Sequence, residues 1–104
     1  MSSSVEVKKR RYHAVIREPG PAWDPGRGMR EQDGWDEHAA FMDGLAEEGF
    51  IVLGGPLGDE RGHALHIVDA ADTREVERRF AEDPWSDQML RIARIELWTV
   101  LLEG

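Results

Sequence analysis

A histidine in the middle of a predicted helix is the residue best suited to acid–base chemistry in this chain. Apolar residues recur at helical spacing between positions 33 and 49, and His38 shares their face with Trp35, Met42 and Leu45. The imidazole should therefore face the interior, where burial disfavours its charged form and its ring nitrogens need hydrogen-bond partners. A neutral, oriented imidazole is what a general base near neutral pH requires. The alternative is a core histidine with a purely structural role.

An aspartate stands where a second helix is expected to end. Asp83 precedes Pro84, and proline disfavours helical geometry in the residue before it. The C-terminal end of a helix repels carboxylates, so this side chain should be held by a partner, such as a histidine ring nitrogen. Asp-Pro is also a common turn former. Both interpretations of Asp83 stay open at this point.

The other histidines give weaker signals. His66 shares one face of a predicted strand with Ala64 and Val68, and it could extend a polar pocket or point away from it. His13 falls in another strand, and His63 falls at the edge of a hairpin. No pair of histidines has the spacing of a known metal site, so we expect no metal.

A glycine-rich turn and two tryptophans complete the set of candidates. The expected turn around Gly55 and Pro56 lacks the spacing of a nucleotide-binding loop, but its backbone N–H groups could receive an oxyanion. Trp23 and Trp85 could form the walls of a pocket, although tryptophans in small cores more often only pack. The predicted substrate-binding residues are therefore Gly55, Pro56, Trp85, Trp23 and His66.

Composition narrows the class of protein. The 104 residues suit one domain, and the net charge of -8 argues against a nucleic-acid partner, because phosphate contacts need clustered Lys and Arg. The absence of cysteine excludes disulfides, thiol catalysis and cysteine–zinc sites. No signal-peptide core is present, and no stretch approaches the roughly 20 apolar residues of a membrane span. We therefore expect a cytoplasmic protein with no membrane partner.

The predicted elements follow in the order strand, helix, strand, strand, helix, strand within a single domain spanning 1–104. The expected ranges are a tail at 1–10, strands at 11–17, 50–53, 64–68 and 91–102, helices at 33–49 and 72–83, and a Pro/Gly-rich loop at 18–32. Right-handed crossovers then give an α+β, ferredoxin-like βαββαβ fold, in which a four-stranded antiparallel sheet carries both helices on one face. The last strand is apolar on both sides, so a second copy should cover the open face in a symmetric dimer.

Local signals predict where the helices begin and end. Asp33 should cap the first helix and Gly49 should close it. Asp72 should cap the second helix, with Glu75 at the capping-box position. Residues 85–90 are expected to form one or two irregular helical turns. The loop at 18–32 is long enough to be a lid or binding loop, but it could equally be a plain surface connection.

Taken together, the ordered motifs resemble the YciI-like (YCII-related) family between Tyr12 and Leu102. The motifs are Gly34-Trp35-Asp36-Glu37-His38-Ala39-Ala40-Phe41, Glu48-Gly49-Phe50, Gly54-Gly55-Pro56-Leu57, Glu82-Asp83-Pro84-Trp85 and Trp98-Thr99-Val100. The resemblance implies a dimeric α+β barrel and a His–Asp pair in a pocket, which maps onto His38 and Asp83. Most members of the family have no assigned reaction. One related branch acts as a dehydrochlorinase on chlorinated hydroxyquinols, so the resemblance implies a scaffold able to support elimination or proton transfer.

Two functions fit these observations. The first is a cofactor-independent enzyme in which His38 and Asp83 transfer a proton, or drive an elimination, on a small aromatic or cyclic molecule. The second is a non-catalytic dimer that binds or senses a small ligand, in which the same pair only pins the end of a helix. An assembly subunit that uses its dimer face alone is a third, weaker option. His66 and the loop that carries Trp23 are features that the family pattern does not demand.

Overall fold

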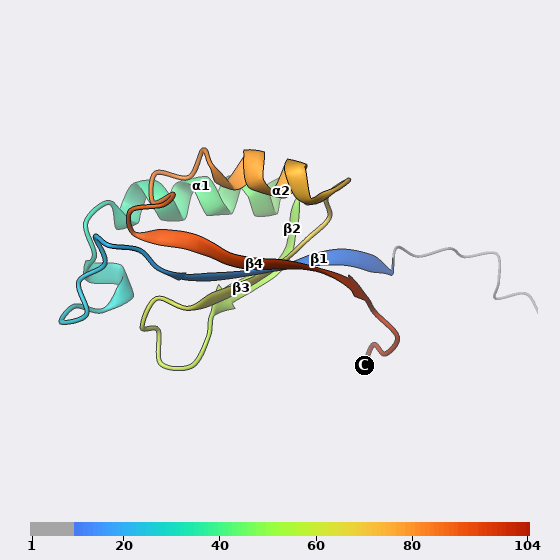
Figure 1. Cartoon of the computed structure of the whole chain (residues 1–104), viewed down its shortest axis with the longest axis horizontal. Coiled ribbons are helices and arrows are strands. Elements are labelled where there is room, and N and C mark those ends of the chain that lie inside the picture. Colours follow the sequence, from blue (N-terminus) through green and yellow to red (C-terminus); the bar gives the residue numbers. More distant parts are fainter. Residues whose placement is uncertain (1–9) are drawn as a thin grey trace, which may run out of the picture.

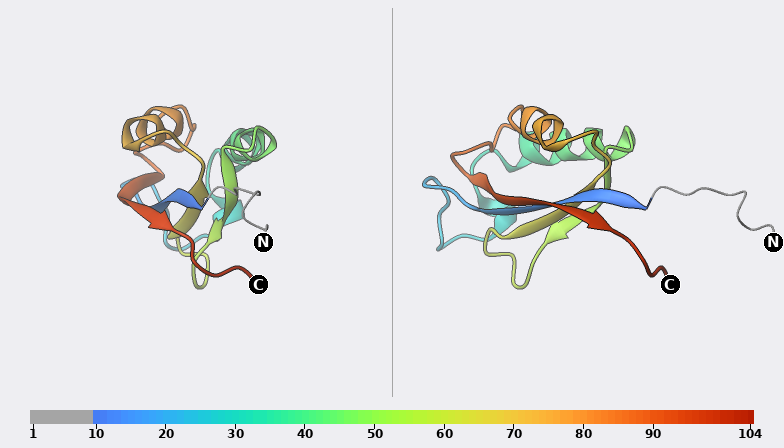
Figure 2. Two further views of the ribbon diagram at one scale, coloured as in Figure 1. Left: turned by 90° about the vertical axis from the view of Figure 1, so that its right-hand side faces the viewer. Right: turned by 45° about the vertical axis from the view of Figure 1, so that its right-hand side comes forward.

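Four strands form one antiparallel sheet, and two helices lie side by side on one of its faces (Figure 1 and Figure 2). The computed structural model describes residues 10–104. The elements are β1 (Arg11–Pro19), the short 3-10 helix η2 (Met29–Glu31), α1 (Trp35–Glu47), β2 (Ile51–Pro56), β3 (Ala64–Val68), α2 (Thr73–Phe80) and β4 (Leu90–Thr99). The strand order β2-β3-β1-β4 is that of the α+β ferredoxin-like fold, which confirms the predicted architecture.

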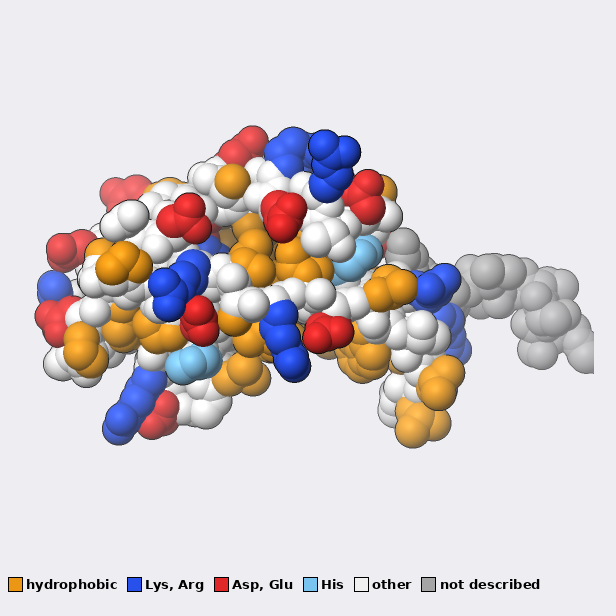
Figure 3. Space-filling view, viewed as in Figure 1, with side chains coloured by type: hydrophobic (Ala, Val, Ile, Leu, Met, Phe, Trp, Pro, Cys, Tyr) orange, Lys and Arg blue, Asp and Glu red, His pale blue; other side chains and the backbone are white. Residues whose placement is uncertain are grey.

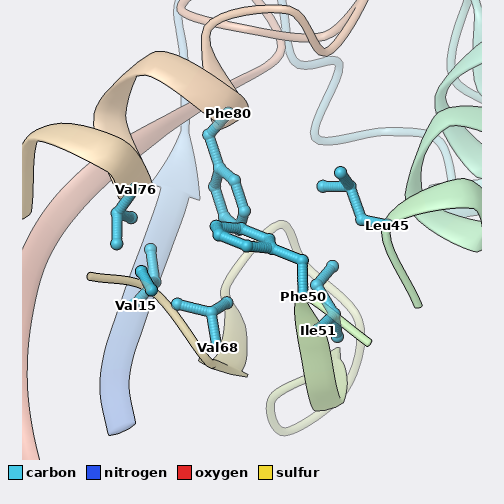
Figure 4. Packing of buried hydrophobic residues seen from close by; sticks show 8 residues of the cluster. Val15, Leu45, Phe50, Ile51, Val68, Val76 and Phe80 are labelled. Carbon is cyan, nitrogen blue, oxygen red and sulfur yellow. The ribbon is translucent and has the colours of Figure 1, made fainter. Parts of the chain in front are cut away.

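The core fills the space between the two helices and the sheet. Val15 of β1 and Val68 of β3 are fully buried, as expected for the inward residues of the two central strands. Val76 and Phe80 lie four residues apart, so α2 turns both toward the sheet. Figure 4 shows the Phe80 ring reaching Phe50, with the two ring centres 6.3 Å apart in an edge-on arrangement.

The predicted cap of the second helix is confirmed. The Asp72 carboxylate accepts a hydrogen bond of 2.9 Å from the backbone N–H of Glu75, and the Glu75 carboxylate accepts one from the backbone N–H of Ala71. The predicted cap of the first helix is wrong, because α1 follows Gly34 rather than Asp33. Gly34 has φ 78, and a Cβ there would lie 3.1 Å from Nε1 of Trp85. Glycine therefore allows the bend that brings this indole against the start of α1.

Residues 54–56 continue strand β2, which corrects the predicted turn around Gly55 and Pro56. They pair with residues 64–66 of β3, and the chain turns only after Leu57, whose N–H donates to the carbonyl oxygen of His63. A proline is tolerated here because β2 is an edge strand with one unpaired side. The backbone groups near Gly55 thus belong to a sheet edge rather than to a loop.

Strand β4 contains a bulge that the alternating pattern did not predict. Val15 pairs with Ile95, but Arg17 pairs with Ile92, because the register shifts by one residue between these pairs. Ile92 and Ile95 therefore both pack against the core, whereas strict alternation would have placed Ala93 with Ile95. The strand is also shorter than its predicted range of 91–102.

Residues 85–90 form tight turns closed by a bridge between Ser86 and Leu90, so the predicted helical turns are wrong. Asp87 has φ 68, in the left-handed region, and one such residue interrupts a right-handed helix. These turns hold the Pro/Gly-rich loop, because Gly20 donates its N–H to the carbonyl oxygen of Met89 at 2.8 Å. The buried Gln32 side chain ties the loop internally through hydrogen bonds to the backbone of Asp24.

The sheet face opposite the helices carries an apolar groove of about 410 Å³. Its lining residues are Leu53, Gly54, Gly55, Pro56, Leu57, Leu65, Ile67 and Trp98. Leu53 is 66% exposed and Trp98 is 44% exposed, so the groove presents apolar side chains side by side on the surface. Figure 3 shows hydrophobic side chains reaching the surface below the strands, on the side away from the helices. Within residues 10–104, neither helix is long and apolar enough to cross a membrane.

Candidate active site

His38 and Asp83 meet in the interior, between the first helix and the turn that follows the second. Nδ1 of His38 lies 2.9 Å from Oδ1 and 2.9 Å from Oδ2 of Asp83. The aspartate side chain is completely shielded from solvent, and the histidine is also buried. The ring of Trp85 stacks flat on the imidazole, with 4.0 Å between the ring centres and 9° between their planes. Contacts on its edge and on one face therefore fix the orientation of His38.

Three donors surround the Asp83 carboxylate. Besides His38, the Arg17 guanidinium donates from one terminal nitrogen to Oδ2 at 2.8 Å, and the backbone N–H of Trp85 donates to Oδ1 at 2.9 Å. Burial alone would raise the pKa of Asp83. The hydrogen bonds from His38 and Trp85, with the charges of His38 and Arg17, outweigh burial and lower that pKa below its ordinary value. Asp83 is thus a carboxylate at neutral pH.

The ionised Asp83 decides which nitrogen of His38 carries the proton. A carboxylate can only accept hydrogen bonds, so Nδ1 of His38 must be the N–H that points at it. In the neutral ring Nε2 then holds a lone pair and can take a proton from a ligand. When Nε2 does so, Asp83 stabilises the positive charge that the ring gains. His38 can therefore act as a general base, and Asp83 is the residue that orients it.

A cavity of about 430 Å³ lies between α1 and β2, and His38 is part of its wall. The residues that line it are Met29, Trp35, His38, Ala39, Met42, Asp43, Ala46, Ile51, Val52, Leu53, Gly54, Gly55, Pro56, Ala64, His66 and Leu90. Most of these side chains are apolar, and the two imidazoles are its main polar groups apart from Asp43. This volume and lining suit a small organic molecule with an apolar body and one polar group.

The structure places some of the predicted site residues in the cavity wall and the others outside it. His38, His66, Gly55 and Pro56 line the cavity. Asp83 does not line it, because the carboxylate lies behind the imidazole and reaches a ligand only through His38.

The two tryptophans also lie outside the cavity. Trp85 supports the far side of His38, and its indole N–H donates to the backbone carbonyl oxygen of Asp33 at 2.8 Å. Trp23 packs edge-on against Trp85, with 5.9 Å between ring centres. The loop at 18–32 instead contributes Met29 to the cavity wall.

Arg17 is a site residue that the sequence interpretation missed. Its side chain is 1% exposed, and its guanidinium lies over the ring of Phe80, 5.1 Å from the ring centre. The available signal was the alternation of β1, which puts Arg17 on the same inward face as Val15. A charged residue on a buried strand face needs a partner of opposite charge, and Asp83 is that partner.

Among residues 10–104, no three His, Asp or Glu side chains cluster in a way that could hold a metal ion. Comparison with protein-family models, with curated proteins and with solved structures gives no significant match to this chain. The functional interpretation therefore depends on the geometry of the cavity and of the His38–Asp83 pair.

Proposed function

We propose that this chain is an acid–base enzyme of the YciI-like type that needs no cofactor and acts on a small organic molecule bound beside α1. The proposal depends on one observation above all: a buried carboxylate fixes Nδ1–H of His38, which leaves Nε2 for a ligand in the cavity. His38 would act as the catalytic base or acid. Asp83 would be a positioning residue, because it does not line the cavity and would act on a ligand only through the imidazole of His38.

The chemistry that suits this arrangement is removal of a proton from carbon. The imidazole takes the proton at Nε2, and the electron pair left behind either moves into an adjacent unsaturated group or expels a leaving group from the neighbouring carbon. Both outcomes, isomerisation and elimination, begin with the same step. The mostly apolar walls of the cavity favour a substrate with an apolar body, such as an aromatic or cyclic ring.

A non-catalytic ligand-binding or sensing dimer is the second candidate, and the Arg17–Asp83 contact favours it. This ion pair joins β1 to the turn after α2 at a completely buried position. Such a network can serve to hold elements together whether or not chemistry takes place. We also propose that two copies pair through the apolar groove of the open sheet face, as in dimeric α+β barrels.

Hydrogen–deuterium exchange separates the two candidates without knowledge of the natural reaction. The protein is incubated in D₂O with a panel of aryl and cyclic ketones, and proton NMR records exchange of the C–H next to the carbonyl group. An enzyme exchanges at least one compound, and His38→Gln abolishes that exchange while the fold is retained. Binding of the same compounds without exchange above the His38→Gln level would favour the sensing function and reject the catalytic one.

A further inference from the structure

His66 is the second imidazole in the wall of the cavity. It lies on β3, in register with Val15 of β1 and with Gly54 of β2, so its side chain points to the helix side of the sheet. The ring is 7% exposed and packs edge-on against Phe80, with 5.5 Å between ring centres. His66 is therefore held between the core and the cavity.

Gly54 shows which side of this ring faces strand β2. A Cβ atom built on Gly54 would lie 2.6 Å from Cδ2 of His66, 3.4 Å from Cγ and 3.5 Å from Nε2. Cδ2 and the adjacent Nε2 are thus on the side of the ring turned toward β2, Nδ1 is across the ring from Cδ2, and the cavity lies between β2 and α1. The glycine makes room for the imidazole, since any larger side chain would collide with it.

The surroundings of Nδ1, the other ring nitrogen of His66, indicate which of the two nitrogens carries the proton. Nδ1 of His66 is buried and has no hydrogen-bond partner. Buried N–H groups without acceptors are rarer in proteins than buried acceptors without donors. These points place the proton on Nε2, where it can donate into the cavity.

His66 keeps this neutral form over the working pH range. Burial has the largest effect on its pKa, and the charges of Arg17 on β1 and His38 on α1 add to it. Together they outweigh the opposing effect of Asp83 and lower the pKa of His66 to about 3. A neutral imidazole N–H is a hydrogen-bond donor that brings no charge of its own into an apolar cavity.

We propose that His66 is a second catalytic group, which donates a hydrogen bond from Nε2–H to the carbonyl oxygen of the substrate while His38 removes a proton from the adjacent carbon. This inference rests on the proposed acid–base function and narrows the substrate to small carbonyl compounds with an acidic neighbouring C–H. The electron pair of the broken C–H bond forms the C=C bond of an enolate. The negative charge develops on oxygen beside His66, and the proton moves to Nε2 of His38. Return of that proton to carbon restores both imidazoles.

The decisive comparison is between His66→Leu and His66→Gln in the exchange assay, with phenylacetone as the probe. Leucine removes the donor, and glutamine restores an N–H close to the original Nε2. We expect His66→Leu to slow exchange by about 10²–10³-fold and His66→Gln to remain within about tenfold of the parent. Gly54→Ala, which displaces the ring, should follow His66→Leu. It also keeps the test valid if the leucine variant does not fold. Gly44→Ala has open space at its Cβ and controls for the loss of a glycine.

A binding experiment gives a readout that a purely structural role would not change. Bound 4-nitrophenol reports on an oxyanion donor through the absorbance of its phenolate, so its pKa on the protein should be higher in His66→Leu than in the parent. Equal phenol pKa values, or equal exchange rates in parent and His66→Leu, would overturn the role of His66. If His38→Gln still abolishes exchange in that case, the acid–base function stands. If the parent exchanges no ketone of the panel, the acid–base function fails, and with it the catalytic role of His66.

Discussion

Nδ1 of His38 lies 2.9 Å from both carboxylate oxygens of Asp83, although 45 positions separate the two residues in the chain. The contact joins the first helix to the turn after the second, and Trp85 covers one face of the imidazole. The Asp-Pro-Trp sequence of that turn thus supplies both the carboxylate and the ring that orient His38.

Asp83→Asn should remove the base without removing the imidazole. The amide of asparagine can donate to Nδ1 of His38, which would move the ring proton to Nε2 and leave no lone pair toward the cavity. We expect exchange activity to fall by about 10³–10⁴-fold, as when the wrong histidine tautomer is imposed in a catalytic triad. Nitrogen-15 NMR of the histidine ring should report the change of tautomer. Asp87→Asn, at an exposed position with φ 68 that asparagine tolerates, is the control and should leave the tautomer unchanged.

Arg17→Met should destabilise the fold strongly. It leaves the Asp83 carboxylate buried without its guanidinium partner, and breaking one side of a buried ion pair costs about 3–5 kcal/mol. Urea unfolding of Arg17→Met, Asp83→Asn and the double variant should give a double-variant loss well below the sum of the two single losses. Arg91→Met breaks the exposed pair with Glu18 and should cost less than about 1 kcal/mol. If the stability losses of the two single variants simply add in the double variant, Arg17 and Asp83 do not stabilise each other.

His66 should make the protein less stable in mild acid. Its pKa is about 3 in the folded protein, whereas the unfolded chain has the ordinary value of 6.5. The unfolded chain therefore binds the proton first as pH falls. The free energy of unfolding should therefore be unaffected by His66 above pH 6.5 and fall by up to about 1.4 kcal/mol per pH unit between 6.5 and 3. Asp83, whose pKa is lowered from 3.8, keeps its full contribution above that pH and loses it as the pH falls further. The difference between parent and His66→Leu unfolding curves should show this slope, and the difference between parent and His63→Gln, at an exposed hairpin position, should not.

Two glycines should respond to alanine in opposite directions. Gly62 has φ 101, and its Cβ would lie 2.7 Å from Pro19 and 3.2 Å from Trp23, so Gly62→Ala should loosen the loop at 18–32 and lower the melting temperature. Gly44 lies inside α1 with nothing near its Cβ, so Gly44→Ala should stabilise the helix by about 0.5–1 kcal/mol. Calorimetry of both variants measures the two effects. A melting temperature unchanged in Gly62→Ala would mean that the Trp23 contact does not hold the loop.

Pairing through the open sheet face should be sensitive to charge in the apolar groove. If two copies associate there, light scattering should give twice the chain mass of 11.8 kDa, and Trp98→Glu should give the single-chain mass. Ala40→Glu, on an exposed position of α1, is the matched control and should keep the larger mass. A parent protein that runs as a single chain at high concentration would refute the dimer.

The sequence predicted the order of elements well because each carries a local signal. The strand at 64–68 has the predicted bounds, and the second helix has the predicted Asp72 cap. The sequence also singled out His38 and Asp83, the first by its place on an apolar helix face and the second by its conflict with a helix end. Both signals are local consequences of burial and of the helix dipole.

The missed features depend on contacts between distant segments. Arg17 looked like an ordinary polar residue of an alternating strand, because its partner lies 66 positions away. Trp85 was expected to line the pocket, yet its ring stacks on one face of His38 outside the pocket. No spacing along the chain could indicate this contact. The predicted turn at residues 54–56 failed because a glycine in a strand can also mark close approach of a neighbouring side chain. At Gly54 that neighbour is His66.

The bulge in β4 has a consequence for how this chain can be compared with others. Inward residues before and after the bulge fall in opposite phases of the two-residue repeat, as Ile92 and Ile95 demonstrate. An ungapped match to a relative with a regular last strand would fit one half of β4 and misplace the other half by one residue. Relatives of this protein should therefore be sought with a one-residue insertion allowed at position 93.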